Sequence, residues 1–384
     1  MTDNRYRRLP VGIQSFKVIR EENYLYVDKS DIVWNMVNLG DKYNYLSRPR
    51  RFGKSVLVDT LEAYLEGRKD LFEGLKIMQM EKDWKQYPVI RLDMSRGGAS
   101  EDTLRSYLNL RFKDYEEKYN ITPDPTAMLA DRFHAIIATA YKQTGLRVAV
   151  LIDEYDSPLQ HSWRTPEHEK CTGVYREVFA ILKADDEYEH FVFITGITKF
   201  TQISLFSVLN NLSNISFTPE YAAICGITEE EIEENFMPEI RQMSEANNWS
   251  VQETHDRLKA YYDGYHFSRR NMVDVYNPYS LVNALKSKEI INFWASSGAT
   301  SLLPKFVDNA ELRMKSFENC RIMRNTLELS DVSGGGAELF LYQSGYLTIK
   351  DSDEFGYILG FPNEEVKQAL YEEGKGLLDW KRAE

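Results

Sequence analysis

The sequence predicts an α/β fold in which helices sandwich a parallel sheet. Two runs, Val148–Ile152 and Phe191–Ile194, contain only apolar residues, and such runs are typical of strands that are covered on both faces. The segments around them repeat apolar residues every three or four positions, which predicts helices. Strands that alternate with helices in this way predict a parallel sheet with crossover helices.

The expected elements follow one another along the first part of the chain. A domain of this type needs several strands, and the sequence offers five with helices between most of them. We expect strands at 24–29, 43–47, 88–93, 147–154 and 191–196, and helices at 56–65, 103–119, 125–144 and 167–183. Residues 1–220 are therefore predicted to form one α/β domain.

The remaining chain has a different texture. Residues 221–300 contain three segments with helical periodicity, at 229–246, 251–262 and 279–288, so we expect a helical lid domain there. In residues 301–384, two short apolar segments at 345–350 and 357–361 flank a turn and predict a β-hairpin. Helices followed by a hairpin suggest a winged-helix-like module.

Composition limits the classes of function. The chain has 384 residues, 43% of them hydrophobic, and a formal net charge of −12, which argues against broad binding of nucleic acid. Its three cysteines are far apart and form no CxxC pair, so we expect no zinc ribbon and no disulfide framework. The apolar runs are too short to cross a bilayer, so no membrane partner and a cytoplasmic location are expected.

A phosphate-binding loop is predicted between the strand at 43–47 and the helix that follows it. Phe52-Gly53-Lys54-Ser55 supplies the second half of the pattern GxxxxGK[ST], in which main-chain N–H groups and the lysine bind phosphates and the hydroxyl binds Mg²⁺. Arg48 occupies the first glycine position, and Pro49 favours an extended backbone there. The predicted nucleotide-binding residues are Arg48, Pro49, Arg50, Arg51, Phe52, Gly53, Lys54, Ser55 and Val56.

Two acids end the apolar strand at 147–154. We expect Asp153 to hold Mg²⁺ through water opposite Ser55, and Glu154 to orient and polarise an attacking water. Lys54 would join Glu154 as a catalytic residue, because it neutralises charge on the transferred phosphate. The order of loop and acidic strand along the chain makes a chance match to either motif improbable.

A third catalytic candidate, Thr195, ends the neighbouring strand, where many ATPases carry a polar residue that senses the γ-phosphate. Thr198 and Lys199 follow closely. No single arginine stands out as an arginine finger, and the candidates are Arg50, Arg51 and Arg176. The aromatic segment 261–267 could stack nucleobases, but a turn that packs two helices together is the favoured interpretation.

With these residues in view, the chain resembles the bacterial AAA-ATPase-like family of predicted ATPases. The likeness covers nearly the whole chain and rests on residues 9–16, 26–29, 46–55, 151–156, 262–267 and 276–280. Arginine in place of the first loop glycine is usual in that family. The resemblance implies an ATPase core, a helical lid and, commonly, a C-terminal nuclease-like domain of the PD-(D/E)XK superfamily, which we expect to be absent because the chain stops at Glu384. It also implies that residues 12–16 and 26–29 lie near the adenine base.

The sequence therefore favours a P-loop protein that binds ATP, rather than GTP, with Mg²⁺ as cofactor. The favoured activity is a Mg²⁺-dependent ATPase that acts as a conformational switch. Two alternatives remain, a nucleotide-binding interaction module with little turnover and the regulatory ATPase part of a nucleic-acid-processing protein. The expected partners are the nucleotide and an unidentified protein, with nucleic acid left open although the charge does not indicate it.

Overall fold

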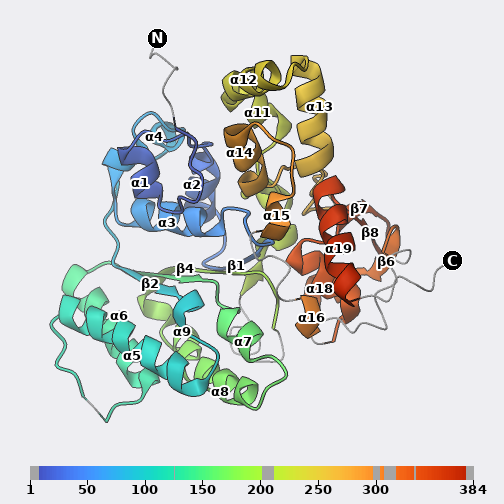
Figure 1. Cartoon of the computed structure of the whole chain (residues 1–384). Coiled ribbons are helices and arrows are strands. Elements are labelled where there is room, and N and C mark those ends of the chain that lie inside the picture. The colour runs from blue at the N-terminus through green and yellow to red at the C-terminus, as the bar shows by residue number, and fades with distance from the viewer. Residues whose placement is uncertain are drawn as a thin grey trace. The chain divides into compact units, whose positions relative to one another are not determined.

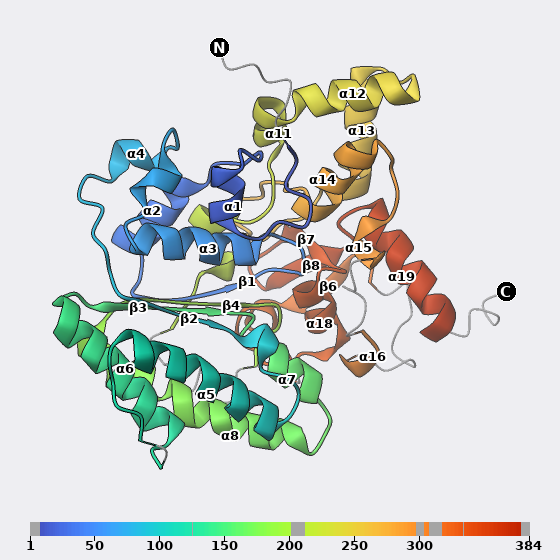
Figure 2. The same cartoon turned by 60° about the vertical axis from the view of Figure 1, so that its left-hand side comes forward.

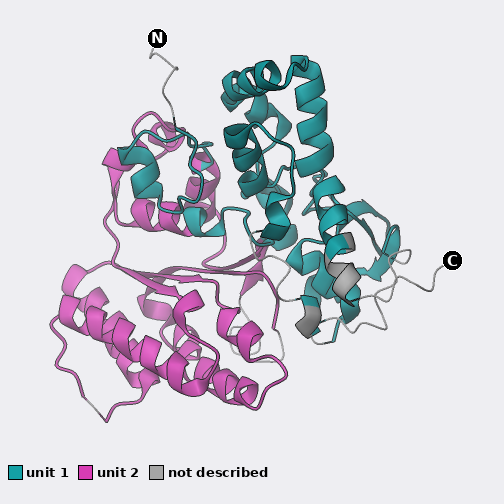
Figure 3. Ribbon diagram, viewed as in Figure 1, with its two compact units in different colours: residues 1–29, 48–57, 216–384 teal, residues 30–47, 58–215 magenta. Residues whose placement is uncertain are grey.

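A computed structural model describes residues 8–124, 126–200, 212–296, 303–306, 317–332 and 334–377 (Figure 1). By its internal contacts the chain divides into two compact units, each made of separate segments (Figure 3). Unit 1 comprises residues 1–29, 48–57 and 216–384, and unit 2 comprises residues 30–47 and 58–215. This division differs from the three domains expected from the sequence, which remain a proposal.

Unit 2 is built on a five-stranded sheet in the order β2-β3-β4-β1-β5, and every neighbouring pair is parallel. The strands are β1 (Tyr43–Ser47), β2 (Val89–Asp93), β3 (Val148–Asp153), β4 (Glu189–Gly196) and β5 (Ser213–Asn214). Every residue of β3 is buried, as the continuous apolar run predicts for a strand covered on both faces. The predicted α/β fold with a parallel sheet is confirmed.

Helices cover both faces of this sheet (Figure 2). One face carries α2 (Ser30–Asn38), α4 (Ile77–Met80) and most of α3 (Lys54–Leu65). The other carries the long helices α5 (Glu101–Lys118), α6 (Leu129–Thr144) and α8 (Glu167–Phe179). The shorter elements of this unit are α7 (Ser157–Ser162), α9 (Ile181–Ala184), η2 (Lys69–Phe72), η3 (Met94–Arg96) and η4 (Asp186–Tyr188).

Unit 1 contains the helices that the sequence predicts after residue 221. They begin at side chains able to cap them: Thr228 starts α11 with a capping box, and Ser250 caps α13. Their apolar faces form a core that includes Phe236, Leu258 and Leu281, and Leu25 of the N-terminal segment belongs to it as well. The elements are α1 (Phe16–Glu21), η5 (Ile215–Phe217), which straddles the boundary between the two units, η6 (Pro219–Tyr221), α11 (Glu229–Asn235), α12 (Met237–Asn247), α13 (Val251–Tyr262), α14 (Pro278–Ser287) and α15 (Phe293–Ser296).

The C-terminal part of unit 1 contains the predicted hairpin. Strands β7 (Thr348–Ser352) and β8 (Gly356–Gly360) pair antiparallel, and β6 (Cys320–Met323) adds a third strand in the order β6-β8-β7. The helices of this part are α16 (Leu303–Phe306), α17 (Arg324–Leu329), α18 (Gly336–Ser344) and α19 (Glu364–Leu377). The expected boundary at residues 300 and 301 lies outside the described residues.

The strand expected at 24–29 is wrong. Tyr24 makes a single parallel bridge with Arg8, and no ladder continues from it among the described residues. Tertiary contacts hold the segment instead, because Leu25 enters the helical core and Lys29 forms an ion pair with Glu231 at 2.6 Å. Alternating apolar residues here reflect this anchoring to helices rather than a place in a sheet.

Candidate functional site

The predicted phosphate loop connects β1 to α3. Its backbone turns sharply, because Arg51 and Gly53 both have positive φ angles, of 69° and 82°. Glycine adopts this left-handed conformation without cost, whereas an arginine with its β-carbon adopts it only when the surroundings compensate. Arg50, Ser55 and Val56 are half-buried.

Lys54 begins α3, and its side chain folds back across the loop. The residue is 5% exposed, and its Nζ donates to the carbonyl oxygens of Arg48 and Pro49, each at 2.9 Å. An ammonium group has three donors, so these two bonds leave it directed into the curve of the loop main chain. A phosphate that binds Lys54 has to compete with the two carbonyls for it.

Arg48, at the position of the usual first glycine, directs its side chain into the protein. It is 1% exposed, with Nη1 donating to the carbonyl of Ser216 and Nη2 to that of Tyr221, each at 2.9 Å. The guanidinium also lies over the ring of Phe267, 4.1 Å from its centroid. Burial lowers the pKa of this guanidinium. The Arg48 side chain thus holds the loop entry to unit 1, while its main chain belongs to the loop itself.

Aromatic rings hold the rest of the loop. Phe52 is 1% exposed and meets the edges of Tyr265 and Phe267, with ring centroids 4.7 and 5.4 Å away. The guanidinium of Arg51 lies over the ring of Tyr279 at 4.9 Å. Sequence reasoning missed these contacts. The signal was present in the dense aromatic segment 261–267, but nothing in the sequence says which distant residues it packs against.

The loop also has a close neighbour at the end of α18. Gly345 has a positive φ of 91°, and a β-carbon built there would lie 2.7 Å from Cβ of Pro49. Only glycine satisfies both the left-handed backbone and this approach. Pro49, itself buried, is therefore fixed by the C-terminal part of unit 1.

In unit 2, the predicted acids lie at the carboxyl edge of the sheet. Asp153 ends β3 in register with Asp93 of β2, and it is 3% exposed. Glu154 follows with a positive φ of 47°, an unusual conformation for a residue with a β-carbon. Tyr155 N then donates to the carbonyl of Thr195 at 3.0 Å, so the ends of β3 and β4 are tied together. The structure brings Asp153, Glu154 and Thr195 to the same edge.

Thr195 is fully buried in β4. Its hydroxyl donates to the carbonyl of Leu46 in β1 at 2.8 Å, so the hydroxyl proton is already used in a hydrogen bond between two strands. Only the acceptor side of this hydroxyl is left for a ligand. The arginine candidate on α8, Arg176, is exposed.

Asp156 is a residue of this edge that sequence reasoning did not single out. It is 1% exposed, and its Oδ2 accepts from Ile197 N at 3.0 Å and from N and Oγ1 of Thr198 at 2.6 and 2.7 Å. Gln160 Nε2 donates to the same oxygen. Gly196 makes room for it, since a β-carbon there would lie 2.7 Å from the Tyr155 ring and closer still to Asp156. Asp156 thus fixes the turn after β4.

Tyr155 supports the same turn from inside the protein. Its hydroxyl donates to the carbonyl of Thr198 at 2.8 Å and accepts from Phe200 N at 3.0 Å. Burial raises the pKa of this phenol well above its usual value, so it stays protonated and remains a donor.

A metal site made of protein groups alone is not evident. Among the described residues no three His, Cys, Asp or Glu side chains gather in a way that could hold a metal ion. Beside nucleotides, Mg²⁺ usually binds one or two carboxylates together with phosphate oxygens and waters. The half-buried Ser55 and the carboxylate of Asp153 are oxygen donors of the required kind.

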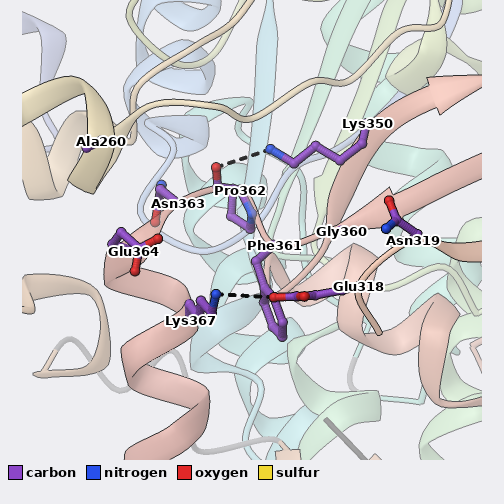
Figure 4. A pocket seen from close by; sticks show the side chains of 10 residues that line it. All are labelled: Ala260, Glu318, Asn319, Lys350, Gly360, Phe361, Pro362, Asn363, Glu364 and Lys367. Carbon is purple, nitrogen blue, oxygen red and sulfur yellow. Dashed lines mark hydrogen bonds and ion pairs between the residues drawn. The ribbon is translucent and has the colours of Figure 1, made fainter. Parts of the chain in front are cut away.

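A pocket in unit 1 contains none of the predicted site residues (Figure 4). It has a volume of about 410 Å³ and lies beside the start of α19. The lysines that line it point to protein acceptors: Lys350 Nζ donates to the carbonyl of Pro362 at 3.2 Å, and Lys367 pairs with Glu318 at 3.2 Å. Both of its lysines thus already contact oxygen atoms of the protein.

The comparisons with known proteins agree with the motifs. Residues 10–206 match the AAA-ATPase-like family, described as predicted AAA-ATPase. The chain is 33% identical over 376 residues to an uncharacterized protein in the vnfD 5′ region of Azotobacter chroococcum mcd 1, covering 95% of this chain and 69% of that protein.

Two solved structures are similar at a low level. They are the Aeropyrum pernix ORC1 protein in complex with DNA, with a TM-score of 0.30 and 13% identity over 89% of this chain and 90% of that one, and Cdc6p from Pyrobaculum aerophilum, with a TM-score of 0.27 and 11% identity over 97% of each. Within the described residues, no helix is both long and apolar enough to cross a membrane. The two sequence matches identify the family, and this chain belongs to the AAA-ATPase-like family of predicted AAA-ATPases.

Proposed function

We propose that this chain binds ATP with Mg²⁺ through the loop at residues 48–56 and hydrolyses it slowly as a conformational switch. The observation that carries the proposal is the local geometry of Lys54, whose ammonium is held by the loop's own carbonyls at 2.9 Å. In a strand–loop–helix segment of this kind the lysine at this position reaches the phosphates, so Lys54 lies where such a contact can form.

The acidic edge of unit 2 supports the hydrolytic part of the proposal. Glu154 keeps a positive φ of 47° directly after a fully buried strand. Strained backbone of this kind costs of order 1–3 kcal/mol and persists where the surroundings over-determine it, often at functional sites. In the proposed roles Asp153 supplies an oxygen for Mg²⁺ and Glu154 orients the attacking water. Bound Mg²⁺ would neutralise charge on the phosphates.

The test measures binding and turnover separately in the full chain. Titration calorimetry with ATP and Mg²⁺ should show saturable binding in the wild type and a loss of at least about tenfold in affinity in Lys54→Ala, because a charge-assisted contact to phosphate is removed. Lys113→Ala is the matched control, since Lys113 is exposed on α5 and pairs only loosely with Glu117, at 3.8 Å. Equal affinity in Lys54→Ala and Lys113→Ala would contradict the loop assignment.

Turnover is followed by phosphate release at saturating ATP. Glu154→Gln should lower the rate by about 10²–10³ while binding persists, because it removes the group that polarises water. Glu117→Gln, at the other end of the exposed α5 pair, should leave the rate unchanged. Saturable binding with no release above the Lys54→Ala background would instead establish a nucleotide-binding module with little turnover.

A further inference from the structure

The loop belongs, by its contacts, to unit 1, which does not contain the five-stranded parallel sheet. Residues 48–57 group with residues 1–29 and 216–384 (Figure 3). The side chains at its non-glycine positions contribute to this attachment, since Arg48, Arg51 and Phe52 each contact an aromatic ring of unit 1. A glycine-rich loop would have no side chains with which to make such contacts.

Arg48 makes the most specific of these contacts. Its two terminal nitrogens donate to the carbonyls of Ser216, in η5, and Tyr221, the last residue of η6. Both residues are buried, so neither carbonyl is readily satisfied by solvent if the arginine is removed. The planar guanidinium presents several donors in fixed directions, whereas a lysine ammonium at the same place is a single point charge. The site is therefore built for an arginine.

The main chain of Arg48 is in turn bound by Lys54. Its carbonyl accepts from Lys54 Nζ at 2.9 Å, and the next carbonyl, that of Pro49, does the same. One residue thus joins the proposed phosphate-binding ammonium, through its carbonyl, to residues 216–221, through its side chain. A movement of Lys54 toward a phosphate would lengthen its bond to the carbonyl of Arg48, the residue whose side chain binds the main chain of Ser216 and Tyr221.

We propose that Arg48 is a positioning residue that couples the occupancy of Lys54 by phosphate to the segment at 216–221 and to the aromatic segment at 262–267. The proposal rests on the proposed function and goes beyond it, because it names the route by which nucleotide acts on unit 1. Coupling of this kind is reciprocal, so a change at residues 216–221 also alters the affinity of Lys54 for phosphate.

The experiment follows amide hydrogen exchange of the full chain with and without a saturating non-hydrolysable ATP analogue and Mg²⁺. In the wild type, the exchange rates of peptides covering residues 216–222 and 262–267 should change several-fold, in either direction, when the analogue is bound. Suitable reporters are Tyr221 N and Ala222 N, which donate to the carbonyls of Thr218 and Pro219. Arg48→Lys and Arg48→Gly should bind the analogue up to about tenfold more weakly and, at saturation, lose at least half of this difference.

Two comparisons distinguish a role of Arg48 in positioning the loop from a role in the stability of the fold. Arg132→Lys removes another nearly buried guanidinium fork, the one that binds Glu116 in unit 2, and should keep the full wild-type difference. Arg48→Gly places at this position the glycine of the general phosphate-loop pattern. If this variant loses the exchange difference, the cause is therefore the missing arginine side chain and not a residue that the loop backbone cannot accommodate. If neither Arg48 variant folds, Phe267→Leu removes the ring beneath the guanidinium and should show the same loss.

Three results of the exchange experiment would contradict the proposal. A ligand-dependent difference that persists in both Arg48 variants overturns the coupling. Binding that depends on Lys54 but leaves the exchange of both segments unchanged in the wild type overturns the coupling and leaves the proposed function standing. A wild-type chain that does not bind the analogue overturns both.

Discussion

The two regions that carry the predicted chemistry are held in place by different kinds of interaction. The carboxyl edge of the sheet in unit 2 is fixed by one buried carboxylate, Asp156, which accepts hydrogen bonds from the main-chain N–H groups of Ile197 and Thr198. The loop in unit 1 is fixed by a cation that donates to two carbonyls, Arg48, and by ring contacts such as Phe52 on Tyr265.

This difference has consequences for how each region responds to change. Hydrogen bonds that main-chain N–H groups donate to a buried carboxylate are directional, and losing one leaves a buried donor unsatisfied. Contacts between rings and cations are less directional, so they permit small movements while they maintain attachment. The acidic edge is thus held by a carboxylate alone, whereas the loop attachment combines the directional hydrogen bonds of Arg48 with ring contacts that permit small movements.

The largest effect is expected at the acidic edge. Asp156→Asn replaces an oxygen that accepts four donors with a group that can present an N–H to them, so we expect a loss of about 2–4 kcal/mol in the free energy of unfolding. Urea unfolding measures the change. Asp102→Asn, an exposed residue in the first turn of α5, should change stability by less than about 0.5 kcal/mol. Equal stability of the two variants would show that the turn after β4 does not depend on Asp156.

Sequence reasoning could reach one of these regions more fully than the other. β3 and β4 were predictable because burial on both faces leaves continuous apolar runs, and the motif around Lys54 is local in sequence. Arg48 was recognised only as a departure from the glycine pattern. Its partners, Ser216 and Tyr221, lie 168 and 173 residues further along the chain, so no local pattern reports the contact.

Asp156 escaped notice for a related reason. An acid two residues after Glu154 looks in sequence like any solvated acid, and only the fold reveals that it is buried against residues 196–198. The expected strand at 24–29 failed because alternating apolar residues serve anchoring to helices as well as strand pairing. Strands and motifs can thus be predicted where they leave a periodic or local pattern in the sequence. The tertiary partners of a residue leave no such pattern.

A second buried carboxylate, that of Glu189, lies at the amino end of the same sheet and differs from Asp156 in its hydrogen-bond partners. Glu189 is fully buried, its Oε2 accepts from the hydroxyl of Tyr43 at 2.6 Å, and its Oε1 has no hydrogen-bond partner among the described residues. Burial raises the pKa of Glu189 to about 8. A carboxyl surrounded by few donors is thus held protonated, in contrast to the donor-rich setting of Asp156.

This raised pKa makes stability depend on pH. Because the folded chain binds the proton more tightly than the unfolded chain, Glu189 contributes full stability at acid pH and loses it as the pH rises from about 4.5 to about 8. Glu189→Gln removes this loss, so the stability of the variant relative to the wild type should rise across this window, by at most about 1.4 kcal/mol for each pH unit. Urea unfolding at pH 5, 6, 7 and 8 tests it, with the exposed Glu187→Gln as control. A difference independent of pH would show that Glu189 is already ionised in the folded chain.

The smallest effect is expected for the ring contacts. The test is whether the contact between Phe52 and Tyr265 responds to a bound nucleotide, unlike an ordinary ring pair of the core. Double-mutant cycles compare Phe52 and Tyr265 of unit 1 with the stacked pair Phe112 and Phe133 of unit 2, whose centroids are 5.2 Å apart. With leucine substitutions, each pair should show a coupling of about 0.5–1.5 kcal/mol in urea unfolding. If the ring contact transmits loop occupancy, a saturating ATP analogue with Mg²⁺ should change the Phe52–Tyr265 coupling and leave the other pair unchanged. Identical behaviour of both pairs would mean that the rings at the loop only fill space, and the transmission would then depend on Arg48 alone.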